Sequence, residues 1–178
     1  RRLAAGYAAG SLGIGLLATS AGGAWLWLLW AAGALALVAL IYLVLDAEAF
    51  EKRADGSMPG AVRCLLGPYL LAAWLNSRWW TRRLPAASPV SAGILLGRLP
   101  GEADLRRHGV VAIVDLCAEL PCPTPGVRHT VVPLLDLVPP SLAQLEQASA
   151  AIDDARQIGQ VLVCCALGFA RSALAVAA

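Results

Sequence analysis

The sequence lacks charge in its first part, has few histidines and shows no cysteine framework, and each shortage excludes a class of protein. No charged side chain occurs between Leu3 and Leu45. The net charge of the whole chain is only +2, so nothing indicates a nucleic-acid partner. The five cysteines form neither a zinc-ligand spacing nor an even-numbered disulfide framework, and two of them are adjacent. This pattern favours a reducing compartment.

What the sequence has instead is an unusually apolar first part. The whole chain is 58% hydrophobic with a mean hydropathy of +0.67, which is too apolar for an ordinary soluble domain. Ala24–Leu45 is uncharged and long enough to cross about 30 Å of hydrocarbon. Leu3–Thr19 is a second uncharged run, and Ser20–Gly23 separates the two. Residues 3–45 are therefore predicted to form a transmembrane helical hairpin, with a cleaved signal peptide or a buried soluble helix as alternatives.

Residues 46–89 are predicted to be a polar linker followed by an interfacial amphipathic segment. Ala61–Asn76 is helical in pattern but short for a membrane span, and Arg78–Arg83 mixes tryptophan with arginine. Such a mixture suits the headgroup layer of a bilayer. With two spans, the basic residues of this half share one face of the membrane, and the positive-inside rule then predicts an integral membrane protein whose C-terminal domain is cytoplasmic. These residues are Arg1, Arg2, Lys52, Arg53, Arg63, Arg78, Arg82 and Arg83. A third span would reverse that side.

Residues 90–178 alternate apolar runs with helical patterns, which predicts an α/β domain with a central, mostly parallel sheet flanked by helices. The expected strands are 94–96, 110–114, 127–135 and 161–163, and 85–89 is expected to be a linker. Ser141 is expected to cap a helix, because Gln144 follows at the capping-box position. The chain begins without methionine and ends within a helix-like run. We therefore expect a piece of a longer protein, with this domain truncated at its C-terminus.

The stretch from Cys165 to Ser172 carries the strongest chemical signal. It follows an apolar strand, and its Cys and Arg are separated by five residues. Backbone N–H groups of such a loop converge on an anion and favour a thiolate. Arg171 can grip two phosphate oxygens, and Ser172 can ease the departure of the sulfur. We therefore expect nucleophilic catalysis through a phosphorylated cysteine. The expected phosphate-binding residues are Ala166, Leu167, Gly168, Phe169, Ala170 and Arg171.

Hydrolysis also needs a group that protonates the leaving oxygen. Asp136 is the favoured candidate because it lies on a loop between a predicted strand and the Ser141 helix. Asp115, at the end of another strand, is its rival. Glu119 is expected to be solvated, with a place facing the site as the alternative. His129 is expected on the surface.

The segment from Val90 to Ala178 resembles the dual-specificity branch of the protein-tyrosine-phosphatase superfamily, whose signature is Cys, five residues, Arg, then Ser or Thr. The resemblance implies Cys165 as nucleophile, Arg171 as phosphate binder and Asp136 as general acid, with no metal and no organic cofactor. A membrane hairpin before such a domain is similar to membrane-anchored bacterial phosphatases of this kind. The family usually has His where this chain has Cys164. Cys164 is interpreted as a core residue, with a redox partner of Cys165 as the alternative.

These features predict a membrane-anchored, cysteine-dependent phosphatase that hydrolyses phosphomonoesters. The five residues between Cys165 and Arg171 include no basic side chain, which favours substrates with a single phosphate. The expected partners are the lipid bilayer and either a lipid monophosphate, such as a phosphatidylglycerophosphate-like lipid, or a phosphoprotein. The alternative is a catalytically inactive membrane scaffold that binds phosphate groups.

Overall fold

The computed structural model describes residues 2–178, so the topological role expected of Arg1 lies outside the described residues. The chain divides into two compact units. The first runs to Glu51 and includes Met58–Ala73, and the second comprises Lys52–Ser57 and Trp74–Ala178. Each unit is described by itself below.

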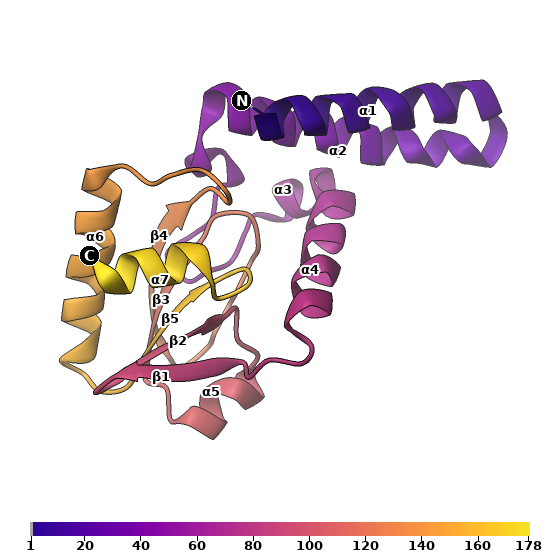
Figure 1. Cartoon of the computed structure of the whole chain (residues 1–178). Helices are drawn as coiled ribbons and strands as arrows, with labels where there is room; N and C mark the ends of the chain where they lie inside the picture. The colour runs from indigo at the N-terminus through magenta and orange to yellow at the C-terminus, as the bar shows by residue number, and fades with distance from the viewer. Residues whose placement is uncertain (1) are drawn as a thin grey trace. The chain divides into compact units, whose positions relative to one another are not determined.

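Two long helices dominate the first unit (Figure 1). α1 spans Arg2–Ala21, and after Gly22 the chain continues through the 3-10 turn η1 (Gly23–Trp27) into α2 (Leu28–Leu40) and the π turn η2 (Ile41–Leu45). Gly22 and Gly23 both have positive φ angles, of 65° and 54°, which glycine adopts without strain. Arg2–Ala21 and Gly23–Leu45 have mean hydropathies of 1.3 and 2.5 and are long enough to cross a bilayer.

Small and polar residues hold α1 against α2. The Ser11 hydroxyl donates to the carbonyl of Ala32 at 2.8 Å. A Cβ built on Gly10 would lie 3.5 Å from the Leu35 side chain, whereas one built on Gly6 would meet nothing. Gly10 therefore faces the second helix, which is the close approach that glycine permits.

The rest of the first unit consists of shorter helices. They are η3 (Ala47–Phe50), α3 (Gly60–Leu65) and the start of α4 (Gly67–Thr81). The sequence predicts one helix over 61–76, but the helix breaks at Leu66, just before Gly67-Pro68, and the second piece continues to Thr81. Proline lacks the N–H that would continue the hydrogen-bonding ladder, which explains the break. Neither α3 nor α4 reaches the length of a membrane span.

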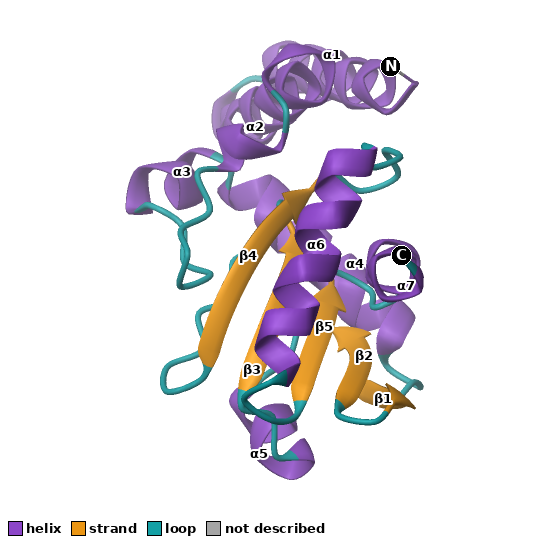
Figure 2. Cartoon of the chain, turned by 90° about the vertical axis from the view of Figure 1, so that its left-hand side faces the viewer, coloured by secondary structure: helices purple, strands orange, loops and turns teal. Residues whose placement is uncertain are grey.

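The second unit contains a five-stranded sheet in the order β1-β2-β5-β3-β4 (Figure 2). The strands are β1 (Ala87–Ser91), β2 (Ile94–Arg98), β3 (Ala112–Cys117), β4 (Arg128–Leu134) and β5 (Val161–Cys165). β1 is antiparallel to β2, and the remaining pairs are parallel, so the expectation of a mostly parallel α/β sheet is confirmed. The linker predicted at 85–89 is wrong in part, because Ala87–Ser91 form the edge strand of a hairpin closed at Gly93.

Three helices flank the sheet, namely α5 (Glu102–His108), α6 (Leu142–Arg156) and α7 (Ala170–Ala177). The capping box predicted for α6 is present: the Ser141 hydroxyl accepts from the N–H of Gln144, whose side chain accepts from the N–H of Ser141. α6 crosses one face of the sheet (Figure 2). It buries Ala148 and Ile152 against alternate residues of β3 and β5, including Val114 and Val163. This side is an apolar core of the kind the β-branched runs predict.

The opposite face of the sheet contains a buried polar group. Asp115 is fully buried in β3, and its carboxylate lies 2.6 Å from the ammonium of Lys52 and 3.3 Å from His129 Nε2. The sequence predicts a linker at this part of 46–89, whereas Lys52–Ser57 pack as part of the second unit. Burial disfavours both charges, but the ion pair raises the pKa of Lys52, and the ion pair together with the His129 hydrogen bond lowers the pKa of Asp115.

These shifts predict how stability varies with pH. The contribution of Asp115 is complete above its ordinary pKa of 3.8 and is lost as pH falls through its lower folded value. The contribution of Lys52 is complete below its ordinary pKa of 10.5 and is lost as pH rises through its higher folded value. In detergent, the urea midpoint for unfolding of the second unit should be highest between these two ordinary pKa values. It should decrease at lower pH, where Asp115 is protonated, and at higher pH, where Lys52 loses its proton. The double variant Lys52→Met/Asp115→Asn should show weaker changes at both ends, and identical profiles would contradict the assignment.

Candidate active site

The candidate site lies between β5 and α7, at the carboxyl edge of the sheet. β5 is buried along its whole length and ends at Cys165, and α7 begins at Ala170. Ligands collect at this edge in open parallel sheets. The first N–H groups of a helix have no carbonyl within the helix to bond, and they attract anions. The turn therefore places a thiol beside a position suited to an oxyanion.

Gly168 shapes this loop. Its φ angle is +79°, and its N–H donates to the Cys165 sulfur at 3.3 Å. A Cβ at this position would come within 3 Å of backbone atoms of Gly97 and Arg98. The loop can therefore curl back over the thiol only because residue 168 has no side chain.

The other predicted phosphate-binding residues line the same turn. Ala166 and Leu167 are half-buried, and Phe169 and Ala170 are exposed. The carbonyl of Ala166 accepts a hydrogen bond from the Ser77 hydroxyl at 2.5 Å. Ser77 lies on α4 and is 4% exposed, and nothing in the sequence connects it with the loop. The start of the loop is thus held by a hydrogen bond from α4, which is not part of the sheet.

Arg171 is buried in the first turn of α7. One terminal nitrogen donates to Glu119 Oε2 at 2.7 Å and to the carbonyl of Leu134 at 2.6 Å, and the other lies 3.2 Å from Asp136 Oδ1. Burial alone would lower the pKa of Arg171, but the neighbouring Cys117, Glu119, Cys165 and Asp136 together raise it. The guanidinium therefore remains charged.

Two further donors of this turn are unsatisfied. Arg171 Nε and the Ser172 hydroxyl are buried and have no hydrogen-bond partner among the described residues. Buried donors normally have partners, because an unpaired one costs about 1–3 kcal/mol. A bound oxyanion would supply an acceptor for Arg171 Nε, and the Cys165 sulfur is the acceptor expected for Ser172, so the two unpaired donors fit the roles expected of Arg171 and Ser172.

The structure brings Asp136 to the site and keeps Asp115 away from it. Asp136 follows β4, its side chain is 41% exposed, and its carboxylate contacts the Arg171 guanidinium. Asp115 instead lies on the sheet face that carries Lys52, completely shielded from solvent. An acid that serves a substrate must be reachable, and of the two carboxylates only Asp136 meets this requirement.

Glu119 belongs to the site, and the expectation that it is solvated is wrong. It is 3% exposed, and its two oxygens accept from Arg171 and, at 2.5 Å, from the backbone N–H of Asp136. Cys117 donates its S–H to the same carboxylate. The position of Glu119 just after β3 could have identified it. β3 and β5 are parallel neighbours, so residues that follow β3 lie at the same edge of the sheet as Cys165.

Cys164 lies in the core. It is fully buried in β5, in register with Gly97 on one side and Asp115 on the other. Successive residues of a strand point to opposite faces, so its side chain is directed away from that of Cys165. Burial raises the pKa of the Cys164 thiol well above its ordinary value. These features agree with its interpretation as a core residue.

His129 is also placed differently from its prediction. Its side chain is 5% exposed, and its ring nitrogens contact Asp115 and, at 2.7 Å, the Thr124 hydroxyl. A polar residue on the buried face of an edge strand gives no clear pattern in sequence.

Within residues 2–178, no group of three or more His, Cys, Asp or Glu side chains is arranged to hold a metal ion.

Comparison with known proteins finds similarity at the level of solved structures. No family model matches the chain, and no curated protein matches it. It is similar to the crystal structure of human DUSP28, with 34% identity over 50% of this chain and a TM-score of 0.45. It is also similar to a mouse protein described as a dual specificity phosphatase, solved in complex with zinc tungstate, with 32% identity over 50% of this chain and a TM-score of 0.44. The matched region spans 64% and 60% of those two chains.

The geometry of Gly168 gives a direct prediction. Gly168→Ala should disorder the turn, because a Cβ would overlap backbone atoms of β2 and residue 168 has a positive φ. Vanadate affinity should fall by about tenfold or more, whereas the fold of the sheet, measured by hydrogen exchange of β3, is retained. Gly126→Ala is the matched control, since Gly126 also has a positive φ but has open space around it. Equal effects of the two variants on vanadate affinity would contradict the role of Gly168.

Proposed function

We propose that this protein is a membrane-anchored, cysteine-dependent phosphatase that hydrolyses phosphomonoesters through a phosphocysteine intermediate. One observation carries the proposal: the turn between β5 and α7 carries both the Cys165 thiol and the buried guanidinium of Arg171, and the loop after β4 brings the reachable carboxylate of Asp136 to that guanidinium. A nucleophile, an oxyanion binder and a proton donor are the groups this reaction needs.

The proposed chemistry divides into two displacements. The Cys165 thiolate attacks phosphorus, an S–P bond forms, and the bond to the leaving oxygen breaks as Asp136 gives that oxygen its proton. Water then attacks the phosphocysteine while Asp136 accepts a proton from it, and the S–P bond breaks to release inorganic phosphate. Ser172 donates to the departing sulfur. During both steps the phosphoryl oxygens would replace Asp136 as partners of Arg171, which binds two of them with its planar fork.

The rim of the turn indicates the substrate class. No basic side chain lies between Cys165 and Arg171, so the site has little to neutralise a second phosphate. Exposed apolar side chains occur instead on the turn and on the Asp136 loop, namely Phe169, Leu137 and Val138. We therefore propose a single phosphomonoester carried by a lipid. A phosphoprotein is the alternative substrate.

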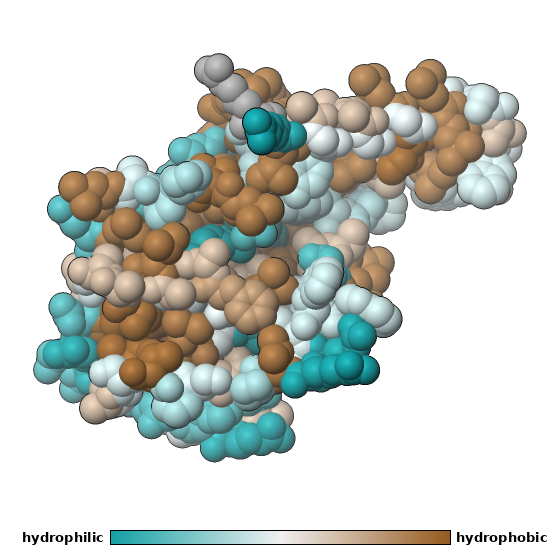
Figure 3. Space-filling view, in the orientation of Figure 1, coloured by the Kyte–Doolittle hydropathy of each residue, from teal (hydrophilic) through white to brown (hydrophobic). Residues whose placement is uncertain are grey.

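Membrane anchoring is supported by the exposure of the two apolar helices. In their most apolar 18-residue windows, only 11% of the first and 28% of the second is buried. A core helix of a soluble protein would be mostly buried, whereas here large side chains such as Leu16 and Val44 are exposed. Apolar side chains cover much of the visible surface of this hairpin (Figure 3). A bilayer is the solvent that such a surface needs.

The C-terminal half of α4 suits the headgroup layer. Trp79 and Trp80 are 63% and 65% exposed, and the Arg82 guanidinium stacks 3.8 Å from the Trp79 ring. The opposite side of the helix is buried and carries Ser77 and Thr81. Such a segment binds anionic lipid through its cations and interfacial aromatics.

The proposal that the catalytic unit lies on the cytoplasmic side of the membrane depends on the arginines of the chain. The charge of Lys52 is paired with that of Asp115, so Lys52 contributes little to the charge bias that decides on which side of the membrane the basic residues lie. Arg2, Arg53, Arg63, Arg78, Arg82 and Arg83 remain, and the positive-inside rule then favours a cytoplasmic catalytic unit. A hairpin before such a unit is similar to membrane-anchored bacterial phosphatases of the dual-specificity type.

The catalytic proposal predicts a specific pattern of loss. In reducing detergent solution, Cys165→Ser should abolish hydrolysis of p-nitrophenyl phosphate by the full-length protein. Asp136→Asn should lower the rate about 10²- to 10⁴-fold for an alkyl phosphate, and less for p-nitrophenyl phosphate, whose leaving group needs little protonation. Cys64→Ser is the matched control, because Cys64 is exposed and lies on α3. Turnover that survives Cys165→Ser would exclude the mechanism.

The same experiment separates the enzyme from the scaffold. If the parent binds vanadate but hydrolyses nothing, the inactive phosphate-binding scaffold is the correct function. Comparing a lipid monophosphate in mixed micelles with a phosphotyrosine peptide then decides the substrate class. Preference for the lipid supports the proposal that the exposed apolar side chains near the turn favour a lipid substrate, and preference for the peptide contradicts that proposal.

Membrane anchoring is tested separately. The full-length protein should remain in the membrane pellet after alkaline carbonate extraction. Replacing Leu35 and Leu37 with arginine should release it, because each arginine at the centre of a span costs about 2.5–3.5 kcal/mol. Extraction of the parent protein by carbonate would contradict the transmembrane hairpin.

A further inference from the structure

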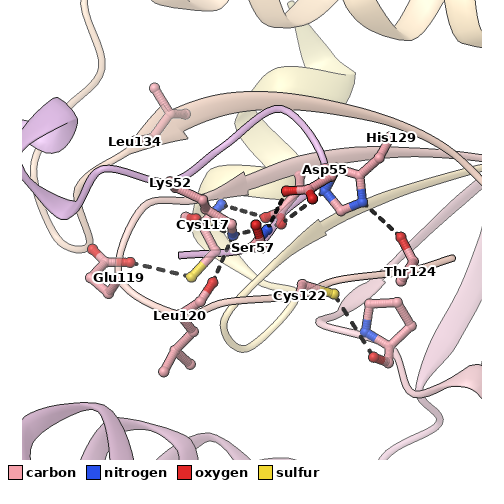
Figure 4. Close-up of polar contacts among 12 residues, drawn as sticks. Lys52, Asp55, Ser57, Cys117, Glu119, Leu120, Cys122, Thr124, His129 and Leu134 are labelled. Atoms are coloured by element: carbon pink, nitrogen blue, oxygen red, sulfur yellow. Dashed lines mark hydrogen bonds and ion pairs between the residues drawn. The ribbon is translucent and has the colours of Figure 1, made fainter. Parts of the chain in front are cut away.

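Lys52 is the only lysine in the chain, among 14 basic residues, and it is buried. Its side chain is 1% exposed, and its ammonium has three acceptors at short distance. One is Asp115 Oδ2, at 2.6 Å. The others are the carbonyls of Cys117 at 2.6 Å and of Leu120 at 2.7 Å, two residues labelled beside Lys52 in Figure 4. An ammonium has three N–H donors, so all of them are used.

The two carbonyls lie on either side of Glu119. Cys117 ends β3 and Leu120 follows Glu119 directly, so Lys52 ties together the two ends of the turn that presents this carboxylate. Asp115 strengthens the same turn, because its other oxygen accepts from the N–H of Cys117 at 2.9 Å. The backbone around Glu119 is thus fixed by one buried cation.

Glu119 in turn fixes two groups of the candidate site. One oxygen accepts from Arg171 at 2.7 Å and the other from the backbone N–H of Asp136 at 2.5 Å. The carboxylate therefore sets where the guanidinium and the start of the acid loop lie. A shift of the turn would move both of them.

We propose that Lys52 is a positioning residue for Arg171 and acts through Glu119. The proposal rests on the proposed function, since it assigns Lys52 to the same site. It also explains why this position carries lysine. Three acceptors around one point suit a compact ammonium, whereas the planar fork of arginine directs its donors differently and needs more space.

The segment that carries Lys52 is itself held in place. Gly56 accepts through its carbonyl from the N–H of Cys122 at 2.8 Å. Gly56 has a φ of +77°, and a Cβ there would come within 3 Å of the Cys122 carbonyl and the His129 ring. Lys52–Ser57 therefore pack closely on the sheet, and Lys52 is directed to its acceptors by more than its own bonds.

A double-mutant cycle tests the proposal. Lys52→Met/Asp115→Asn removes both buried charges together, so that no unpaired charge is left to unfold the protein. The cycle combines this variant with Glu119→Gln. Arg53→Met is the matched control, because Arg53 is exposed and adjacent to Lys52. The quantities measured on the full-length protein are kcat/KM for p-nitrophenyl phosphate and Kd for vanadate, with hydrogen exchange of β5 as the measure of folding.

If Lys52 acts through Glu119, the charge-pair variant should lower kcat/KM about tenfold to hundredfold and weaken vanadate binding. In the Glu119→Gln background, the same change should cost less than about threefold, because the contact it supports is already altered. Arg53→Met should leave both quantities unchanged.

Additive losses, or a charge-pair variant that is folded and fully active, would overturn the proposal and leave Lys52 a stabilising role only. A parent that binds vanadate without turnover would refute the catalytic function, and the cycle in vanadate Kd would then decide the role of Lys52. A parent that neither binds vanadate nor turns over substrate would overturn both.

Discussion

A buried guanidinium needs an acceptor for each N–H group that is removed from water, and this requirement organises the site around Arg171. Its terminal nitrogens are satisfied by Glu119, by the Leu134 carbonyl and by Asp136. Glu119 comes from the end of β3, and Leu134 and Asp136 come from the end of β4. Removing one of them would leave a buried charge partly unpaired, which is costly in a protein interior. The ends of β3 and β4 and the start of α7 are therefore linked through one side chain.

The sheet also keeps the side chains of Asp115 and Cys165 apart. Asp115 and Cys165 lie on adjacent parallel strands but point to opposite faces, so each meets a different environment. One face holds the ion pair with Lys52, and the other holds the apolar core under α6. The charge pair contacts the backbone around Glu119 from the face opposite to the Cys165 side chain. A buried polar cluster and the turn that follows Cys165 thus occupy the same sheet without sharing a face.

Much of the fold and part of the candidate site could be predicted from the sequence, because these features depend on residues that are close together in the chain. The α6 capping box, the strand before Cys165 and the glycine in the turn each follow from residues close together in the chain. The burial of Glu119 and the placement of Lys52 depend on contacts between distant segments. The sequence suggests that a lysine in a polar stretch is solvated, because only the folded structure brings the Cys117 carbonyl, 65 positions further along the chain, to Lys52. Nothing in the sequence reveals that contact.

The most direct test of the site is to identify the phosphorylated residue during turnover. The full-length protein, mixed with substrate and quenched in acid within one turnover, should carry one phosphoryl group, and mass spectrometry of its peptides should locate that group on Cys165. Phosphate on any other residue would contradict a phosphocysteine mechanism at this turn. Steady turnover that leaves Cys165 unmodified at every quench time, even when Ser172→Ala slows the departure of the sulfur, would contradict it as well.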